Sequence, residues 1–252
     1  MIKKQIRLKK EYLREREKER EAPKPDYLNS KKDNEYQLRS YEDPRVLITS
    51  SRAPSARLKQ FQKEMTELIP NATAMNRGAN KIKDIFDYGI QKDFTEIILI
   101  HENKGEPDGL IVSHLPVGPT IFFGLTGVVL RHDVDKNKDK YSQAYPHLIF
   151  HNLNDRIGER IKIILQNLFP APLNQKSKRT ISFIAEENFI SMRHHNYEKK
   201  DYKTVELFEV GPRFELRPYM IKLGSLIDNS ATIEWSMKSF INTATKNNQI
   251  AN

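Results

Sequence analysis

The stretch VGPRFELRPYMIKL, Val210–Leu223, is decisive for the fold of this chain. Its Gly-Pro pair predicts a turn, and the residues that follow predict an extended strand whose side chains alternate between two faces. One face is predicted to carry Arg213, Glu215 and Arg217, and the other Phe214, Leu216 and Met220. A strand with one apolar face and one arginine-bearing face is suited to binding an anion rather than to catalysis.

The sequences before this stretch predict an imperfect internal repeat. RVLITSS (Arg45–Ser51) predicts a buried strand, and a helix follows from about Pro54 to Ile69. HLIFHNL (His147–Leu153) predicts the matching strand, followed by a helix that ends at Phe169. The apolar residues at helical spacing are Leu58, Phe61, Met65 and Leu68 in the first helix and Ile157, Ile161, Leu165 and Leu168 in the second.

Further strands complete both halves, and each half contains a Val-Gly-Pro turn between two strands. The predicted strands are Thr95–Glu102, Gly109–Leu115, Thr120–Leu125, Arg179–Glu187, Asn188–Tyr197, Thr204–Pro212 and Ala231–Met237. The expected fold class is α/β, with two similar halves, each a short sheet covered by helices. Chance recurrence of short apolar runs is the alternative explanation of the repeat.

The predicted domain organisation has three parts. Residues 1–43 form a basic helical extension and linker, residues 44–237 the folded domain, and residues 238–252 a polar tail. The halves span about 44–132 and 146–237, joined by the polar connector Arg131–Pro146. The charged segment Met1–Glu21 predicts a helix that binds RNA or another protein, or else a solvated or disordered tail.

Composition narrows the classes of function. The chain has 252 residues, with 42 Lys and Arg against 33 Asp and Glu, a net charge of +9 that favours a polyanionic partner. Cysteine is absent, which excludes disulfides, thiolate metal sites and cysteine nucleophiles. Neither a secretory signal nor an apolar run long enough to span a bilayer is found, so we expect a soluble intracellular protein without a membrane partner.

Motifs for catalysis, cofactors or metals are not found. The seven histidines include no HExxH pattern, and the adjacent His194 and His195 would face opposite ways in a strand. No phosphate-loop pattern occurs. The acids Glu102, Glu106 and Asp108 fit a solvated turn better than a catalytic pair. We therefore expect no enzyme activity, no cofactor and no metal.

Cationic and aromatic residues suited to RNA are better represented. Arg52 and Arg57 flank the first strand-to-helix turn, where backbone N–H groups also favour phosphate. An aromatic ring such as that of Tyr197 could stack on an unpaired base. The candidate RNA-binding residues are Arg52, Arg57, Arg77, Lys178, Arg179, Arg193, His195, Tyr197, Arg213 and Arg217. Arg213 could instead pair with Glu215 or a buried carboxylate as a structural element.

Six motifs together resemble the Brix-domain proteins of ribosome assembly, from about Pro44 to Trp235. They are TSSRAPSARLKQF, IPNATAMNRG, HENKGEPDGLIVSHLPVGPT, YPHLIFHNL, RHHNY and EVGPRFELRPYMIKLG. Within that family, GEPDGLIVSHLPVGPT with RHHNY resembles the Brix subunit of the small nucleolar ribonucleoprotein that processes small-subunit precursor rRNA. The start, QIRLKKEYL, is similar to that subunit too.

The resemblance implies two halves, each like an anticodon-binding domain, and a nucleolar, hence nuclear, rRNA-binding factor without catalytic activity. It implies precursor rRNA, guide small nucleolar RNA and other protein subunits of the ribonucleoprotein and the processome as partners. It also implies that Gly211–Arg217 is an RNA-binding signature. Two alternatives remain open: a protein-interaction scaffold of the same complex with little RNA specificity, and a large-subunit Brix paralogue.

Overall fold

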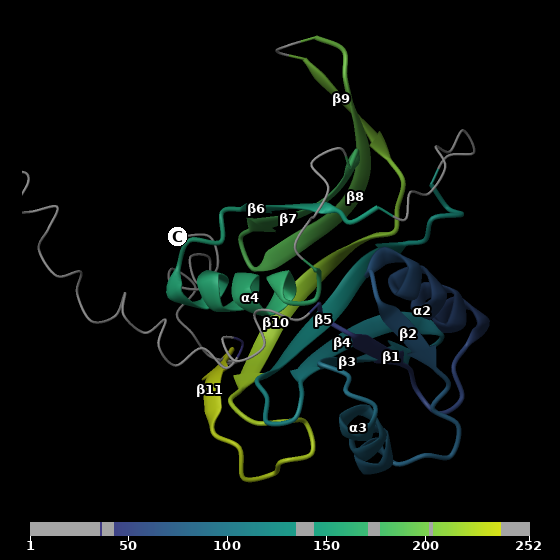
Figure 1. Cartoon of the computed structure of the whole chain (residues 1–252), viewed down its shortest axis with the longest axis vertical. Coiled ribbons are helices and arrows are strands. Elements are labelled where there is room, and N and C mark those ends of the chain that lie inside the picture. Colours follow the sequence, from purple (N-terminus) through teal and green to yellow (C-terminus); the bar gives the residue numbers. More distant parts are fainter. Residues whose placement is uncertain (1–35, 37–42, 135–143, 171–176, 202–203, 238–252) are drawn as a thin grey trace, which may run out of the picture. The chain divides into compact units, whose positions relative to one another are not determined.

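In the computed structural model of the chain, eleven strands join in one sheet with helices packed against it (Figure 1). The structure describes Tyr36 and residues 43–134, 144–170, 177–201 and 204–237. All but Tyr36 belong to one compact unit, Tyr41–Asn252. The predicted helix Met1–Glu21, the tail 238–252 and the middle of the connector, residues 135–143, lie outside the described residues.

The first half contains seven elements and the second half seven more. In chain order the first are β1 (Val46–Thr49), α2 (Ala56–Leu68), β2 (Ala72–Met75), α3 (Ile82–Gln91), β3 (Glu96–Asn103), β4 (Glu106–His114) and β5 (Thr120–Val129). The second are β6 (His147–His151), α4 (Arg156–Gln166), β7 (Arg179–Glu186), β8 (Phe189–Lys199), β9 (Val205–Glu209), β10 (Arg213–Lys222) and β11 (Ile233–Ser236). Every strand and both helices predicted from the sequence are confirmed, with small changes in their ends.

Side-chain caps explain where α2 and α4 begin. The Ser55 hydroxyl accepts a hydrogen bond from the N–H of Leu58 at 3.1 Å, and the Asp155 carboxylate accepts one from Gly158 at 2.8 Å. Each cap satisfies a backbone donor that has no partner within its helix. The predicted apolar stripe of α2 is buried from Leu58 to Leu68. Both helices therefore form where apolar spacing and a capping residue agree.

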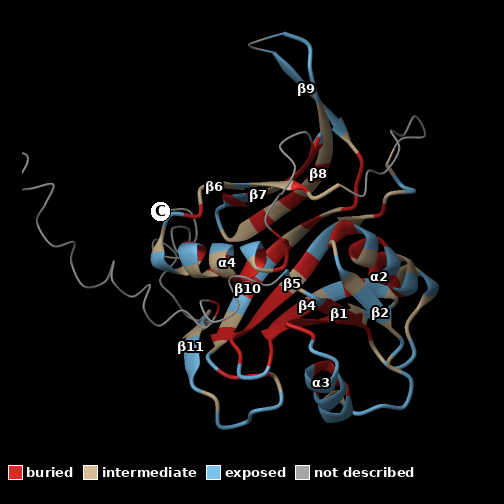
Figure 2. Cartoon of the chain, in the orientation of Figure 1, coloured by how far each residue is buried: buried red, intermediate tan, exposed pale blue. Residues whose placement is uncertain are grey.

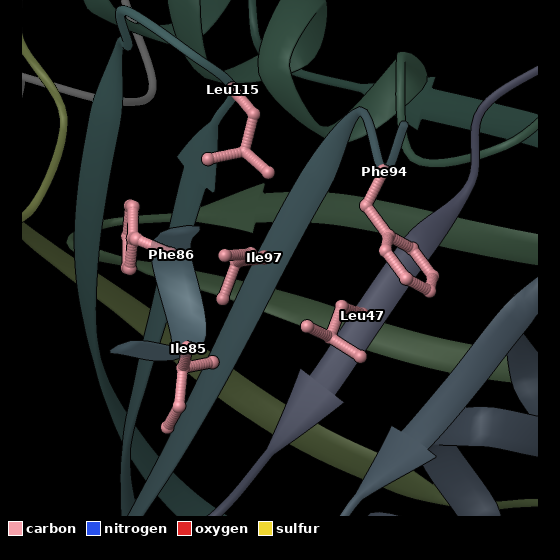
Figure 3. Close-up of a cluster of buried hydrophobic side chains, with 6 residues drawn as sticks. All are labelled: Leu47, Ile85, Phe86, Phe94, Ile97 and Leu115. Atoms are coloured by element: carbon pink, nitrogen blue, oxygen red, sulfur yellow. The ribbon is translucent and has the colours of Figure 1, made fainter. Parts of the chain in front are cut away.

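The sequence analysis did not identify β2 and α3. The helix α3 buries Ile85 and Phe86 against Leu47 of β1 and Ile97 of β3 (Figure 3). Gly89 lets this helix approach the sheet, because a Cβ at that position would lie 3.0 Å from Leu115 Cδ1. A short helix with a glycine inside it has a weak sequence signal, and its stability comes from packing.

The sheet has the order β2-β1-β3-β4-β5-β10-β8-β7-β6, with β11 beside β10 and β9 beside β8. In the first half β1 is parallel to β3, which is followed by antiparallel β4 and β5. In the second half β6 is parallel to β7, which is followed by antiparallel β8 and β10. The antiparallel pair β5–β10 joins the halves, so the prediction of two short sheets is wrong.

Helices α2 and α4 cover the same face of this sheet. Phe61 of α2 packs edge-on against Phe214 of β10, with ring centroids 5.5 Å apart, and Phe169 after α4 lies 6.5 Å from Phe183 of β7. Phe214 and Phe183 are both paired with Met192 of β8, so they point to one face. Figure 2 shows buried residues concentrated along β5 and β10, beneath these helices.

The opposite face is covered differently in the two halves. In the first half α3 packs on it, within the connection Ile69–Thr95 that also holds β2. The corresponding connection in the second half, Asn167–Lys178, is less than half as long. Within the described ranges, no helix packs on this face over β6, β7 and β8. We call this side of the sheet, from β6 to the adjoining residues Arg213–Arg217 of β10, the open face.

Of two irregularities in the pairing of β10 with β5, one changes a predicted face of the decisive stretch. The register of β10 against β5 shifts between Arg213 and Glu215 and again between Pro218 and Met220. Pro218 is paired with Phe123 and Met220 with Phe122, and neighbouring residues of β5 point to opposite faces. The prediction that Met220 shares the face of Phe214 is therefore wrong, because a bulge intervenes.

Candidate nucleic-acid interface

The open face brings together five of the ten candidate residues, on β8 and β10. Register places Arg193 of β8 opposite Ser182 of β7, and Glu215 of β10 opposite Ser191 of β8. Because side chains alternate along a strand, Arg213, Arg217, His195 and Tyr197 share this side of the sheet. The predicted arginine-bearing side of β10 is thus part of a wider polar surface.

Carboxylates occupy part of this surface. Arg193 Nη2 lies 2.6 Å from Glu215 Oε1, and Ser191 also donates a hydrogen bond to Glu215. Arg213 Nη1 lies 2.9 Å from Glu209 Oε2. The partner of Arg213 is therefore Glu209, and Glu215 is the partner of Arg193. Both arginines are held in place while their side chains remain partly exposed, 31% for Arg193 and 41% for Arg213.

Arg217 differs from these two arginines. It is exposed, and it forms no ion pair with any carboxylate that the structure describes. Its guanidinium carbon lies 5.7 Å from the centre of the Phe189 ring, and Nη2 lies 3.7 Å from Met237 Sδ. A cation held against an aromatic ring and open to solvent can contact a phosphate or stack on a base.

His195 and Tyr197 extend the surface along β8. Burial lowers the pKa of His195 below its ordinary value, with Glu209 opposing and Arg193 adding to the shift, so the ring is mainly neutral near pH 7. The Tyr197 hydroxyl donates to Ser177 O at 3.0 Å, and its ring lies 6.2 Å from that of His147. Both side chains are partly exposed and therefore accessible to a ligand.

Arg52 and Arg77 form a second group at the edge of the first half. Arg77 follows β2. Burial lowers its pKa, and the positive charge of the nearby Arg52 adds to the shift. Arg52 is exposed, whereas Arg77 is partly buried. Arg77 also lowers the pKa of His101 on β3, whose side chain lies on the face that continues into the open face.

Arg57 and Lys178 are engaged by carboxylates. Arg57 Nε lies 2.5 Å from Glu106, and Nη2 donates to Val128 O at 3.2 Å. Lys178 Nζ lies 3.5 Å from Glu198 Oε1 and is otherwise exposed. The contacts of Arg57 tie the start of α2 to β4 and β5, so they stabilise the first half.

The prediction that Arg179 lies on an exposed surface is wrong. Arg179 is 1% exposed. Its guanidinium donates hydrogen bonds to Leu68 O at 2.6 Å, to Ala144 O at 3.3 Å and to His194 Nε2 at 2.9 Å. Leu68 ends α2, so Arg179 connects the two halves. Alternation along β7 puts this side chain on the helix-covered face, where no solvent reaches it.

His194 completes this buried contact. Its Nδ1 lies 2.6 Å from Gly211 O and its Nε2 accepts from Arg179, an arrangement that requires the neutral ring with its proton on Nδ1. Burial, reinforced by the charge of Arg179, lowers its pKa to about 3. The adjacent His195 points the other way, as the alternation along a strand predicts.

Glu102, one of the three acids considered for catalysis, has structural partners. Glu102 accepts from Ser55 N at 3.1 Å and from Ser51 Oγ at 3.2 Å. Its pKa is lowered mainly by the Ser55 side chain, and the hydrogen bonds from Ser55 N and Ser51 Oγ add to the shift. Searching the described residues finds no group of three or more side chains able to hold a metal ion. None of the helices in those ranges has the length and apolar character of a membrane span.

Sequence reasoning missed several residues of this surface. Phe189, His101, Gly109 and Gly124 were not assigned to RNA binding, although they lie on the same side of the sheet as Arg217. The alternation pattern could have grouped residues within each strand. Only the register between strands shows which residues are neighbours, and β8, which carries Phe189, is far in sequence from β3, β4 and β5.

Similarity to known proteins agrees with this geometry. The Brix domain family matches residues 51–220. A Brix domain-containing protein of Caenorhabditis elegans is 48% identical over 215 residues, 85% of this chain and 73% of its own length. The human U3 small nucleolar ribonucleoprotein protein IMP4 is 46% identical over 220 residues, with 87% and 75% covered.

A relative of the same name from Schizosaccharomyces pombe is 44% identical over 208 residues, 82% of this chain and 72% of its own. The crystal structure of a probable ribosomal biogenesis protein from Aeropyrum pernix K1 superposes with a TM-score of 0.53 at 20% identity, covering 69% and 96% of the two chains, which shows a shared fold. The resemblance found in the sequence is confirmed: the chain belongs to the Brix-domain family.

Proposed function

We propose that this chain is a non-enzymatic rRNA-binding assembly factor of the small-subunit processome. It assists pairing of the guide small nucleolar RNA with precursor rRNA during 18S rRNA maturation, in the nucleolus and together with other subunits of the ribonucleoprotein. The observation that carries the proposal is the open face with its exposed Arg217 and its partly exposed Arg193 and Arg213. The names of the relatives supply the pathway.

Phosphate contacts supply most of the affinity in this proposal. Arg52 and Arg217 make no ion pair among the described residues, so they can approach RNA without first losing a carboxylate partner. Each neutralised phosphate releases counterions, and affinity therefore falls steeply as salt rises. Such contacts position the RNA but do not read its sequence, which suits a factor that holds two RNAs in register.

A charge reversal of Arg52→Glu with Arg217→Glu tests the interface. We expect RNA affinity to fall at least tenfold. The slope of log affinity against log salt should become shallower by the amount that corresponds to about two lost phosphate contacts. The matched control is Lys59→Glu with Lys63→Glu, an equal change of charge at two exposed positions of α2. Equal losses in both double variants would show that net charge, not the positions of Arg52 and Arg217, determines binding.

A protein-interaction scaffold is the second candidate, and β9 favours it. Among the described strands β9 is paired with β8 alone, and Val205, Leu207 and Phe208 are 50%, 60% and 40% exposed. A strand with a free edge and exposed apolar side chains is a site for a partner protein. Under this hypothesis Leu207→Ser with Phe208→Ser abolishes co-purification of partner subunits while RNA affinity is unchanged.

Crosslinking of the chain to RNA in cells separates the pathways. Enrichment of guide small nucleolar RNA and the 5′ region of precursor rRNA supports the proposal. Enrichment of large-subunit precursor RNA instead assigns the chain to a large-subunit Brix paralogue. Little specific crosslinking with intact assembly favours the scaffold. A fluorescent fusion located outside the nucleolus would contradict the proposed site of action.

We also infer that the halves, about 44–132 and 146–237, arose by internal duplication and that each is like an anticodon-binding domain. The equivalent series of strand pairings supports this origin. So do the two Val-Gly-Pro turns, in which Gly118 and Gly211 both have positive φ, 111° and 76°. An experimental structure in which the shared strands and α2 and α4 do not superpose would contradict the duplication.

A further inference from the structure

One row of residues across the sheet contains two adjacent glycines. His101 of β3 is paired with Gly109 of β4, Gly109 with Gly124 of β5, and Gly124 with Arg217 of β10. Neighbouring strands lie about 4.8 Å apart, so the row spans roughly 14 Å from His101 to Arg217. Between these two side chains, only backbone is presented on this side of the sheet.

The space above the glycines is open on the side of His101 and Arg217. A Cβ at Gly124 would meet only Arg217 Cβ and O, at 3.9 Å, and a Cβ at Gly109 would lie 3.4 Å from His101 Cβ. Both glycines are partly exposed. Neither has positive φ, so turn geometry does not explain the absence of a side chain.

The glycine row lies next to the part of the sheet that α3 covers. The preceding row, Leu99, Ile111 and Phe122, is buried beneath Ile82 of α3 and Leu226 of the loop after β10. One step further along the strands, the described residues provide no such apolar cover. The two glycines therefore form a flat strip of backbone next to the apolar edge of the core.

Flat and cationic groups surround this strip. Arg217 lies over the Phe189 ring on one side, and Tyr219, 44% exposed, packs against Phe122 with ring centroids 5.8 Å apart. On the other side lies the ring of His101, whose pKa is lowered by burial, with Asp108 opposing and Arg77 adding to the shift.

We propose that Gly109 and Gly124 form the floor of a stacking site for one unpaired base of single-stranded RNA, with Arg217 holding the adjoining phosphate. This inference rests on the proposed RNA-binding function and adds to it the class of ligand, a single-stranded nucleotide rather than a duplex. Arg217 and His101 stand at opposite ends of the row, so with Arg217 on the phosphate the base lies towards His101.

The chemistry favours a base over other flat ligands. Peptide planes, histidine, tyrosine and a guanidinium all stack on bases, and every base has such a face. The positive charge of Arg217 complements the phosphate that adjoins the stacked base. A duplex cannot use the strip, because its bases are already stacked on one another.

Filling the strip tests the site without disturbing the fold. Gly124→Val adds a β-branched side chain that suits a strand, and its Cβ would meet no atom closer than the 3.9 Å contacts with Arg217. The control is Thr126→Val on the same strand and the same face, at an exposed position one step from the row. The probes are one fluorescein-labelled single-stranded RNA of mixed sequence and the same strand annealed to its complement.

We expect Gly124→Val to weaken binding of the single strand about tenfold, the loss of one stacked base, and to leave the duplex unaffected. Thr126→Val should change neither affinity, and circular dichroism should show all variants folded. Equal binding of the single strand by wild type and Gly124→Val overturns this inference while the proposed function stands. Failure of the wild type to bind either RNA overturns both.

Discussion

The two halves of the sheet differ in how many of their faces are covered. In the first half α2 and α3 pack on opposite faces, and β1 is buried at all four positions. In the second half α4 packs on one face, and β7 and β8 alternate between buried and accessible residues over most of their length. The same series of strand pairings thus makes a closed core on one side of β5–β10 and a polar surface on the other.

The length of the connection from the first helix of each half to the next strand of the shared series determines which part of the sheet a ligand can reach. The segment between α2 and β3 carries a helix that covers the sheet, and the segment between α4 and β7 is too short to hold both a strand and such a helix. Strands covered on both faces are continuously apolar, whereas strands covered on one face alternate. The alternation of Ser182, Arg193 and Glu215 with apolar residues follows from this difference.

Removing the main anchor of α3 is expected to have the largest effect on stability. Phe86 is 1% exposed in the cluster with Leu47 and Ile97, and Phe86→Ala should lower the free energy of unfolding by about 3–5 kcal/mol. Urea unfolding followed by circular dichroism measures this change. The control is Asp87→Ala, at an exposed position of the same helix, which should cost less than about 0.5 kcal/mol. Similar values for both would show that α3 does not close the first half.

Breaking the buried contact between the halves comes next. Arg179→Met leaves the carbonyl oxygens of Leu68 and Ala144 and the Nε2 of His194 without this donor, at a cost of about 3 kcal/mol in unfolding free energy. Lys178→Met changes the same charge one residue away, at an exposed site, and should be nearly neutral. A variant of Arg179 as stable as that of Lys178 would contradict the structural role.

Acidification should weaken the same contact by a predictable amount. His194 has a pKa of about 3 when folded, so below its ordinary value of 6.5 only the unfolded chain binds the proton. The contribution of His194 to the free energy of unfolding is complete above pH 6.5 and falls by about 1.4 kcal/mol for each pH unit below 6.5. His101 and His195, whose pKa values are also lowered by burial, add in the same direction. In His194→Gln, the slope between pH 6.5 and 5 should be shallower by that amount; an unchanged slope excludes His194 as the cause.

The smallest effect is expected on the open face itself. Ile184 is 38% exposed there, and Ile184→Thr should change the unfolding free energy by less than about 0.5 kcal/mol. Ile111 is 8% exposed beneath Ile82 and Leu226, and Ile111→Thr should cost about 2 kcal/mol, because an apolar side chain is replaced by a buried hydroxyl. A large cost at Ile184 would mean that the open face is covered in the folded chain.

Part of the candidate site could be predicted from the sequence, and its limits have a physical cause. Alternation along β10 places Arg213, Glu215 and Arg217 together because it depends only on residues of one strand. Whether each cation has a partner depends on other strands. Arg213 is paired with Glu209 and Arg57 with Glu106, whereas Arg217 has an aromatic neighbour and no carboxylate partner among the described residues.

The sequence by itself determined the local structure of this protein and its family. Apolar spacing was sufficient for α2, α4 and every described strand except β2, because such signals lie within a few residues of one another. Tertiary structure alone decided that the halves share one sheet, that Arg179 is buried while Arg217 is exposed, and that two glycines lie side by side. Burial and register arise from contacts between residues far apart in the chain, and no local pattern contains that information.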